Sequence, residues 1–217
     1  MTFSPHDVPQ TLRMPNARSI VLLAVLGLVG AAPNAAAQSR QPWSIQGSVL
    51  YTAQDLGGSA GTVGGVGFEA QARRTFPKWS FGFGGQYSTH SSGPDDLDLA
   101  GFFVEPRFVP AVTAGPFAPY LAGRVALLRG SLDAGGLDGS GSSTGFAIGA
   151  GAGLIYPLTR RVNFDIGGAV LRQSLGNITL DDPSETEVAF PSFFGFVLKA
   201  GISVGFEGSK AGAQRSR

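Results

Sequence analysis

The tripeptide His90-Ser91-Ser92 contains the residue types of a nucleophilic hydrolase. His90 and Ser92 are two residues apart, so on an extended strand their side chains lie on the same face. A serine nucleophile needs a base within hydrogen-bond reach and a carboxylate that orients this base. His90 stands where a predicted strand runs into an acidic loop, so we expect a histidine at the rim of the fold and no catalytic residue.

Two glycine-rich strings and one acidic cluster also match motifs that carry chemistry. The string 57–61, GGSAG, fits the G-x-S-x-G pattern of serine hydrolases, and 65–70, GVGFEA, fits a loose dinucleotide-binding pattern. Both patterns require a helix directly afterwards, and no helical periodicity follows either string. The acidic cluster 181–187, DDPSETE, lacks the spacing of an EF-hand. We therefore expect solvated loop charge at this cluster, with no metal and no cofactor.

A further set of charged residues falls on strand faces that otherwise carry glycine, serine and glutamine. The set contains three acids and four bases: Glu69, Glu105, Asp165, Arg73, Arg107, Arg124 and Lys199. Inside a small barrel these charges must be paired, because removing an ion from water costs several kcal/mol unless a partner compensates. If the chain closes into a barrel, we expect an interior ion-pair network that fills it, with the glycines of 79–90 and 145–156 leaving room for the arginines.

The elements that position these charges are eight segments that alternate apolar and polar residues with a period of two. They cover residues 43–53, 66–76, 79–90, 99–109, 119–130, 145–156, 162–173 and 196–206. Each is close to the ~9–11 residues that a tilted strand needs to cross a bilayer. Pro106 is awkward in the fourth segment, because proline cannot donate to a strand ladder.

The connections between the segments alternate between short and long. Short connections cover 77–78, 110–116 and 157–161, whereas long ones cover 54–64, 91–98, 131–144 and 174–191. The long connections are acidic and the short ones basic. Aromatic residues recur near the short connections: Trp43, Phe76, Trp79, Phe108, Tyr156, Phe164 and Phe206. This arrangement is typical of a bacterial outer-membrane barrel with both termini on the periplasmic side.

The first 37 residues have the pattern of a cleaved secretory signal peptide. Arg13 and Arg18 precede a short apolar run at 19–32, and Ala35 to Ala37 form a small-residue cleavage site. Met14 is an alternative start. We therefore expect a signal peptide at 1–37, a barrel domain at 38–206 and a polar periplasmic tail at 207–217.

The composition narrows the function classes. The chain has 16 Lys and Arg against 15 Asp and Glu, so it lacks the basic excess that a nucleic-acid partner requires. No apolar run after Gln38 reaches the length of a spanning helix, so insertion into a membrane must use a β-barrel. The expected fold is an all-β, eight-stranded, antiparallel up-and-down transmembrane β-barrel. A soluble lipocalin-like barrel is disfavoured, because it would place apolar residues inside and charges outside.

The strings PYLAGRVALL at 119–128, GFAIGAGAGLIYPLTRRVNFDIGGAV at 145–170 and KAGISVGF at 199–206 resemble a known family. They are similar to the small eight-stranded outer-membrane barrels of the OmpA/OmpX type, over essentially all of 38–206. The last strand resembles the signal that the outer-membrane assembly machinery reads. Its positions here are Lys199, Gly201, Val204 and Phe206, although the chain continues to Arg217 where many members of the family end at the aromatic residue.

The resemblance implies a monomer that contacts outer-membrane lipid, lipopolysaccharide and the assembly machinery. We expect a non-catalytic structural or surface-interaction role through long acidic extracellular loops. Two alternatives stay open. Lipid A deacylases are eight-stranded outer-membrane enzymes with an H-x-S motif, which His90 and Ser92 match, and some barrels pass small apolar molecules through a lateral opening.

Overall fold

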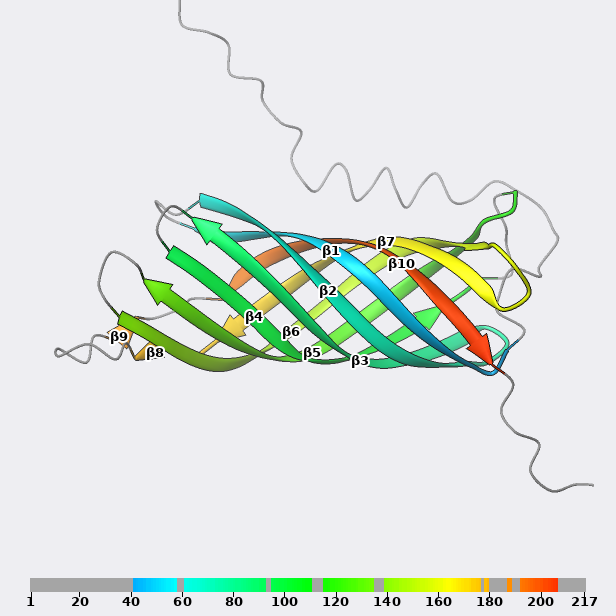
Figure 1. Cartoon of the computed structure of the whole chain (residues 1–217), viewed down its shortest axis with the longest axis horizontal. Helices are drawn as coiled ribbons and strands as arrows, with labels where there is room; N and C mark the ends of the chain where they lie inside the picture. The colour runs from blue at the N-terminus through cyan, green and yellow to red at the C-terminus, as the bar shows by residue number, and fades with distance from the viewer. Residues whose placement is uncertain are drawn as a thin grey trace, which may run out of the picture. The chain divides into compact units, whose positions relative to one another are not determined.

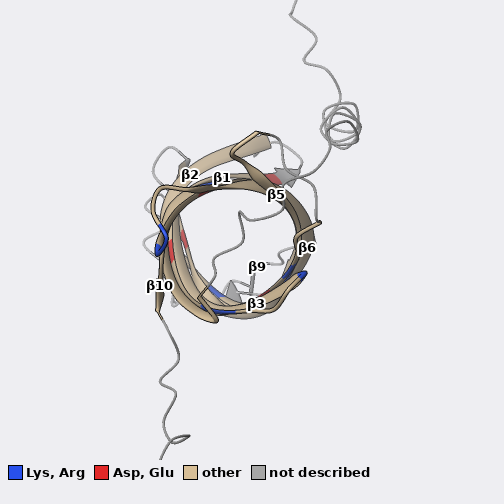
Figure 2. Ribbon diagram, turned by 90° about the vertical axis from the view of Figure 1, so that its right-hand side faces the viewer, with Lys and Arg blue, Asp and Glu red and all other residues tan. Residues whose placement is uncertain are grey.

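The computed structural model describes residues 41–57, 61–92, 95–110, 115–134, 139–176, 178–179, 187–188 and 192–206. Within these ranges eight long strands close into an antiparallel barrel (Figures 1 and 2). The strands are β1 (Trp43–Gly57), β2 (Gly61–Thr75), β3 (Trp79–Ser92), β4 (Asp95–Phe108), β5 (Ala118–Ala134), β6 (Gly139–Pro157), β7 (Val162–Leu175) and β10 (Phe193–Phe206). β10 completes the ring by pairing with both β1 and β7. The predicted eight-stranded up-and-down barrel is confirmed.

Several parts of the expected chain organisation are outside these ranges. They are the predicted signal peptide at 1–37, the first residues of the predicted barrel domain and the tail at 207–217. None of the described segments forms a helix long and apolar enough to cross a membrane.

The strands are longer than the alternating segments predict. β5 has 17 residues and β6 has 19, so this hairpin occupies much of the region expected to be the loop 131–144. β4 begins at Asp95, which places the expected loop residues Asp96 and Asp98 on a strand. Pairing continues past the apolar band because it satisfies the backbone N–H and C=O groups. In the expected loop 174–191, β8 (Ile178–Thr179) and β9 (Glu187–Val188) form a separate two-stranded sheet.

The two faces of the barrel wall have opposite polarity. Side chains on the outer face are large and apolar, and Val49, Phe102 and Leu127 are 66%, 66% and 70% exposed. Side chains on the inner face include many buried polar and charged groups. A barrel with an apolar exterior and a polar interior is suited to lipid surroundings, because lipid tails then cover the apolar band. The period-2 prediction of faces is confirmed.

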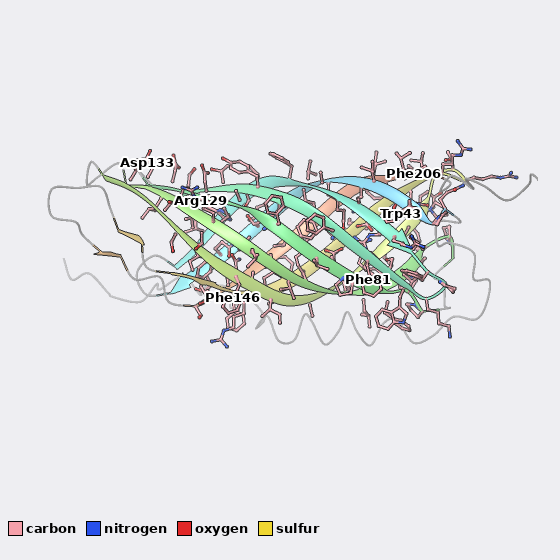
Figure 3. The ribbon with its side chains drawn as sticks, turned by 90° about the horizontal axis from the view of Figure 1, so that it is seen from below. Trp43, Phe81, Arg129, Asp133, Phe146 and Phe206 are labelled. Carbon is pink, nitrogen blue, oxygen red and sulfur yellow. The ribbon has the colours of Figure 1, made fainter. Side chains whose placement is uncertain are left out.

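The two ends of the barrel differ in chemistry. Trp43 pairs with Phe206 where the first and last long strands meet, and Figure 3 shows both at one end of the barrel with Asp133 at the other. We call the first the turn end, because the short connections at 76–78 and 158–161 lie there, and the second the loop end. Trp79 and Phe108 contact at the turn end, with ring centroids 5.0 Å apart. The turn end therefore carries an aromatic belt.

Pro106 interrupts one ladder without opening the barrel. On the β3 side it pairs with Phe81. On the β5 side, pairing passes from Val104–Val125 directly to Arg107–Ala122. A proline has no N–H to donate, which accounts for the gap. Pairing with β3 is continuous, and pairing with β5 resumes at Arg107, so the fourth segment is a strand despite its proline.

Candidate functional site

Glu105 of β4 lies at the centre of a cluster of charged side chains in the lumen. Its Oε1 atom accepts hydrogen bonds from Nη2 of Arg73, at 2.9 Å, and from Nε of Arg107, at 2.8 Å. Its Oε2 atom accepts from Nη2 of Arg124, at 2.7 Å, and from Nζ of Lys199, at 2.8 Å. One carboxylate therefore holds four cations, which come from β2, β4, β5 and β10.

Two further acids complete the cluster. Asp165 of β7 accepts from Nη1 of Arg107 at 2.6 Å. Glu69 of β2 accepts from Nη2 of Arg124 at 2.5 Å and lies 3.4 Å from Nζ of Lys199. The structure thus brings all seven charges singled out in the sequence into one connected group, which we call the charged tier. Each acid has at least one cationic partner, as burial requires.

Tyr120 is a member of the charged tier that sequence reasoning missed. Its hydroxyl donates to Oδ1 of Asp165 at 3.1 Å, and the guanidinium of Arg107 lies 4.1 Å from its ring centroid. A cation over an aromatic face is stabilised by the ring quadrupole. The signal was present in the sequence, because Tyr120 shares the inward face with Arg124 in the segment 119–130.

The glycines around the charged tier only partly match their expected use. Gly82 of β3 does leave room for an arginine, since a Cβ atom there would overlap the side chains of Gln71 and Arg73. On β6, however, a Cβ atom at Gly153 would overlap the ring of Tyr120, and one at Gly149 would overlap Leu171. At these two β6 positions the space is therefore taken by a tyrosine and by β7 and not by an arginine, which differs from the prediction.

The turn end of the lumen contains a small hollow beside the charged tier. Its volume is about 30 Å³, and Ser44, Arg73, Ser80, Asn163 and Asp165 are among its lining residues. This is roughly the space of one water molecule. The side chains of the charged tier therefore fill most of the cross-section at this level.

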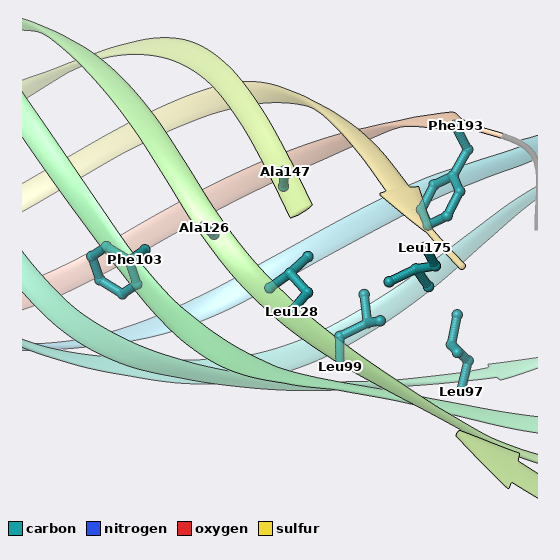
Figure 4. Packing of buried hydrophobic residues seen from close by; sticks show 8 residues of the cluster. All are labelled: Leu97, Leu99, Phe103, Ala126, Leu128, Ala147, Leu175 and Phe193. Carbon is teal, nitrogen blue, oxygen red and sulfur yellow. The ribbon is translucent and has the colours of Figure 1, made fainter. Parts of the chain in front are cut away.

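The loop-end half of the lumen contains a large apolar cluster, whereas the sequence predicted a polar interior. Figure 4 shows this apolar tier, formed by Leu97, Leu99, Phe103, Ala126, Leu128, Ala147, Leu175 and Phe193. The Arg124 guanidinium lies 3.9 Å from the Phe103 ring centroid and so connects the two tiers. The lumen is filled by two kinds of packing. The expected polar interior holds for the charged tier and for buried polar side chains such as Gln54, His90 and Gln173, and the apolar tier is an addition to it.

His90 lies in the lumen, not at the rim. It is 1% exposed, its Nδ1 atom is 3.2 Å from the carbonyl oxygen of Leu97, and its Nε2 atom is 2.7 Å from Oγ1 of Thr52. Because Nδ1 must donate to the carbonyl, a neutral ring accepts at Nε2 from the Thr52 hydroxyl. Both ring nitrogens are therefore occupied.

Two other sequence candidates lie mostly outside the described residues. The side chain of Ser92 is outside the described residues, as is nearly all of the acidic cluster 181–187. Across the described ranges, no group of three or more His, Cys, Asp or Glu side chains could hold a metal ion.

The four residues of the candidate assembly signal divide between the two faces of β10. Lys199 points into the charged tier, and Gly201 also faces inward, where a Cβ atom would overlap the side chain of Ser48. Val204 and Phe206 face outward and are 49% and 42% exposed. Phe206 is the last residue of β10 and pairs with Trp43 at the turn end.

Comparison with known proteins places the fold. No family model and no curated protein sequence matches the chain. Among solved structures, Neisserial surface protein A is similar, with a TM-score of 0.59 and 22% identity over 76% of this chain and 97% of that chain. Ail, the attachment invasion locus protein of Yersinia pestis, has a TM-score of 0.51 and 12% identity over the same shares. The chain therefore has the fold of the small eight-stranded outer-membrane barrels, and the resemblance noted in the sequence is confirmed at the level of fold.

Proposed function

We propose that this chain is a monomeric outer-membrane barrel with a non-catalytic role in membrane integrity or surface interaction. The observation that carries the proposal is the combination of an apolar exterior with a lumen closed by packed side chains. Glu105 and its four cationic partners span the interior, and the apolar tier covers them on the loop-end side. An eight-stranded barrel has an interior just wide enough for side chains to fill.

The orientation follows from the two ends. The aromatic belt and short connections of the turn end suit the periplasmic side, and the loop end with Asp96 and Asp133 suits the cell surface. The wall then contacts outer-membrane lipid and lipopolysaccharide. The assembly machinery reads Lys199, Gly201, Val204 and Phe206 on β10, the strand that closes the ring.

Fractionation of a Gram-negative host that expresses the full chain tests the location. We expect the protein in the outer-membrane fraction, with faster gel migration before heating than after it, because a folded barrel resists unheated detergent. Recovery in the inner membrane or the soluble periplasm would contradict the proposal. A surface role also predicts that protease added to whole cells cuts at the loop end and leaves the tail beyond Phe206 intact.

One substitution can distinguish the proposed role from the alternative of an enzyme that modifies lipid A. His90 is enclosed in the lumen, away from the outer face where lipid lies. We expect His90→Ala to leave the lipid A acylation pattern unchanged in mass spectra of expressing cells, compared with cells that express the unchanged chain. If lipid A lacks an acyl chain in cells with the unchanged chain and keeps it in cells with the variant, the result would instead support the enzyme. A lateral opening is also not favoured, because the described long strands pair around the complete ring.

A further inference from the structure

The outer wall carries an apolar hollow that neither the lumen nor the strand pattern accounts for. It has a volume of about 890 Å³ and extends across β2 to β6. Small residues form its floor and aromatic residues its rim: Ala70, Gly85, Ala100, Phe68, Phe102 and Phe146. Gly85 pairs with both Ala70 and Phe102, so the wall has no large side chain at that point between two aromatic rows. The hollow is therefore formed by the choice of residues on the wall and not by a break in the sheet.

A polar hollow of about 510 Å³ adjoins the apolar one toward the loop end. The two hollows share Tyr87 and Arg129 as lining residues. Figure 3 shows Arg129 on the loop-end side of the barrel, near Asp133. On β5, Arg129 is the first outward polar residue after Leu127, so it lies at the boundary between the apolar band and the polar strand extensions. The two hollows together have the polarity of one amphiphile.

The charges of the polar hollow have both signs. Nη2 of Arg129 donates to Oγ of Ser142 at 3.1 Å, and Arg129 belongs to none of the ion pairs found among the described residues. Asp96, Asp98 and Asp133 line the same hollow, and Asp96 and Asp133 face each other directly across the β4–β5 pairing. Like charges at directly opposite positions destabilise a sheet unless a cation lies between them. The hollow therefore offers one site for an anion and an adjacent one for a cation.

We propose that the two hollows bind one lipid molecule with a phosphoethanolamine headgroup. Its acyl chain lies in the apolar hollow, its phosphate accepts hydrogen bonds from Arg129, and its ammonium group lies between Asp96 and Asp133. A guanidinium binds phosphate through two parallel N–H···O bonds, which favours arginine at such a site. An anionic lipid without an amine meets uncompensated repulsion from the three aspartates that line the polar hollow. The proposal rests on the proposed membrane location.

Native mass spectrometry of the full chain in detergent tests this site without reference to its location in the cell. The probes are phosphatidylethanolamine and phosphatidylglycerol with identical acyl chains, added together in equal amounts. We expect one phosphatidylethanolamine to be retained in preference to phosphatidylglycerol. Arg129→Gln removes a charge-assisted contact, so we expect about tenfold weaker retention of phosphatidylethanolamine. The matched control is Arg172→Gln, which removes an outward arginine on β7 that lines neither hollow and should leave retention unchanged.

Filling the apolar hollow is an independent test. A Cβ atom at Gly85 would meet its nearest neighbours at an ordinary distance of 3.7 Å or more, so Gly85→Leu projects into the hollow without a clash in the wall. Gly47 of β1 also faces outward, and a Cβ atom there has nothing within 4 Å, so Gly47→Leu is the control. We expect Gly85→Leu to abolish retention of the lipid and Gly47→Leu to preserve it, with both variants still folded by heat-modifiable gel migration.

The double variant Asp96→Asn with Asp133→Asn separates the two parts of the headgroup. We expect it to lose the preference for phosphatidylethanolamine and to bind phosphatidylglycerol as well. Equal retention of both lipids by the unchanged chain, or equal effects of Arg129→Gln and Arg172→Gln, would overturn the proposal. A failure of the outer-membrane assignment would appear in the cell fractionation instead, since lipid retention in detergent does not depend on it.

Discussion

Nζ of Lys199 lies 2.8 Å from Oε2 of Glu105, although the two residues are on opposite sides of the barrel. Lys199 is on β10 and Glu105 on β4, and three strands separate them in either direction around the ring. Their contact therefore spans the lumen. Arg107 to Asp165 and Arg124 to Glu69 each cross between strands three positions apart in the same ring. The charged tier thus connects strands that are not neighbours in the ring by ion pairs across the lumen.

Glu105→Gln should be the most damaging single change in the charged tier. The substitution leaves four cations around a neutral amide, and breaking a buried ion pair by removing one partner costs about 3–5 kcal/mol. Urea titration of the folded barrel in lipid vesicles, followed by tryptophan fluorescence, measures the free energy of unfolding. Asp133→Asn, on the exposed outer face, is the control and should not lower this energy, because it removes only the like-charge contact with Asp96. Equal stabilities of the two variants would show that Glu105 is not the centre of the network.

Lys199→Met should cost less than Glu105→Gln, because Glu105 keeps three arginines and the tier then holds three bases and three acids. The two changes should also be coupled. We expect the free energy of unfolding of the double variant to differ from the sum of the single effects by about 0.5–3 kcal/mol, as for residues in one ion-pair network. Additivity within about 0.5 kcal/mol would mean that the contact across the lumen contributes little.

Phe103 and Phe102 offer a matched pair for testing the apolar tier. They are neighbours on β4, but Phe103 is 1% exposed in the lumen and Phe102 is 66% exposed on the outer face. Phe103→Ala leaves a cavity inside the barrel and should lower the free energy of unfolding by about 3–5 kcal/mol. Phe102→Ala should cost clearly less, because lipid can occupy the vacated space. The same urea titration compares them, and a larger loss for Phe102 would contradict the packing described for the loop-end half.

Gly153 should tolerate no side chain while Tyr120 stays in place. A Cβ atom at Gly153 would overlap the Tyr120 ring and also the backbone carbonyl oxygen of Ile166. Gly153→Ala therefore forces the tyrosine away from Asp165 and Arg107 and strains the β6–β7 pairing, which truncation of Tyr120 does not relieve. We expect a loss of about 1–3 kcal/mol, the usual cost of overpacking a filled interior. Combining Gly153→Ala with Tyr120→Phe should not restore stability, whereas combining it with Tyr120→Ala should recover part of it. Gly47→Ala, with open space around the added methyl group, is the control.

The direction of each side chain could be predicted from the sequence, because period-2 alternation assigns faces without knowledge of the partner strands. Glu69, Arg124 and Asp165 are predicted to face inward on this basis, and the structure places them in the lumen. Their partners could not be predicted. Which residues meet across a barrel depends on the stagger of all the strands around the ring, and alternation within a single strand carries no information about it. The four cations around Glu105 therefore emerge only from the closed structure.

The apolar tier was missed for a different reason. Leu97, Leu99 and Phe103 share the inward face of β4 with Glu105, so this face changes from apolar to charged along one strand. The sequence prediction assigned each strand face a single polarity and therefore missed this change along β4. His90 was misplaced because its strand was expected to end there, whereas β3 continues to Ser92 and its inward face is still enclosed.

Planar-bilayer recording on the purified full chain measures most directly whether the packed side chains close the lumen. A sixteen-stranded porin reconstituted in parallel shows that the bilayers detect an open channel. We predict no steady single-channel conductance for this chain, because among the described residues the charged and apolar tiers pack across the lumen, and the hollow beside the charged tier has a volume of about 30 Å³. Large, stable conductance steps that recur in every insertion would contradict the closed lumen and, with it, the proposed role as a non-conducting barrel.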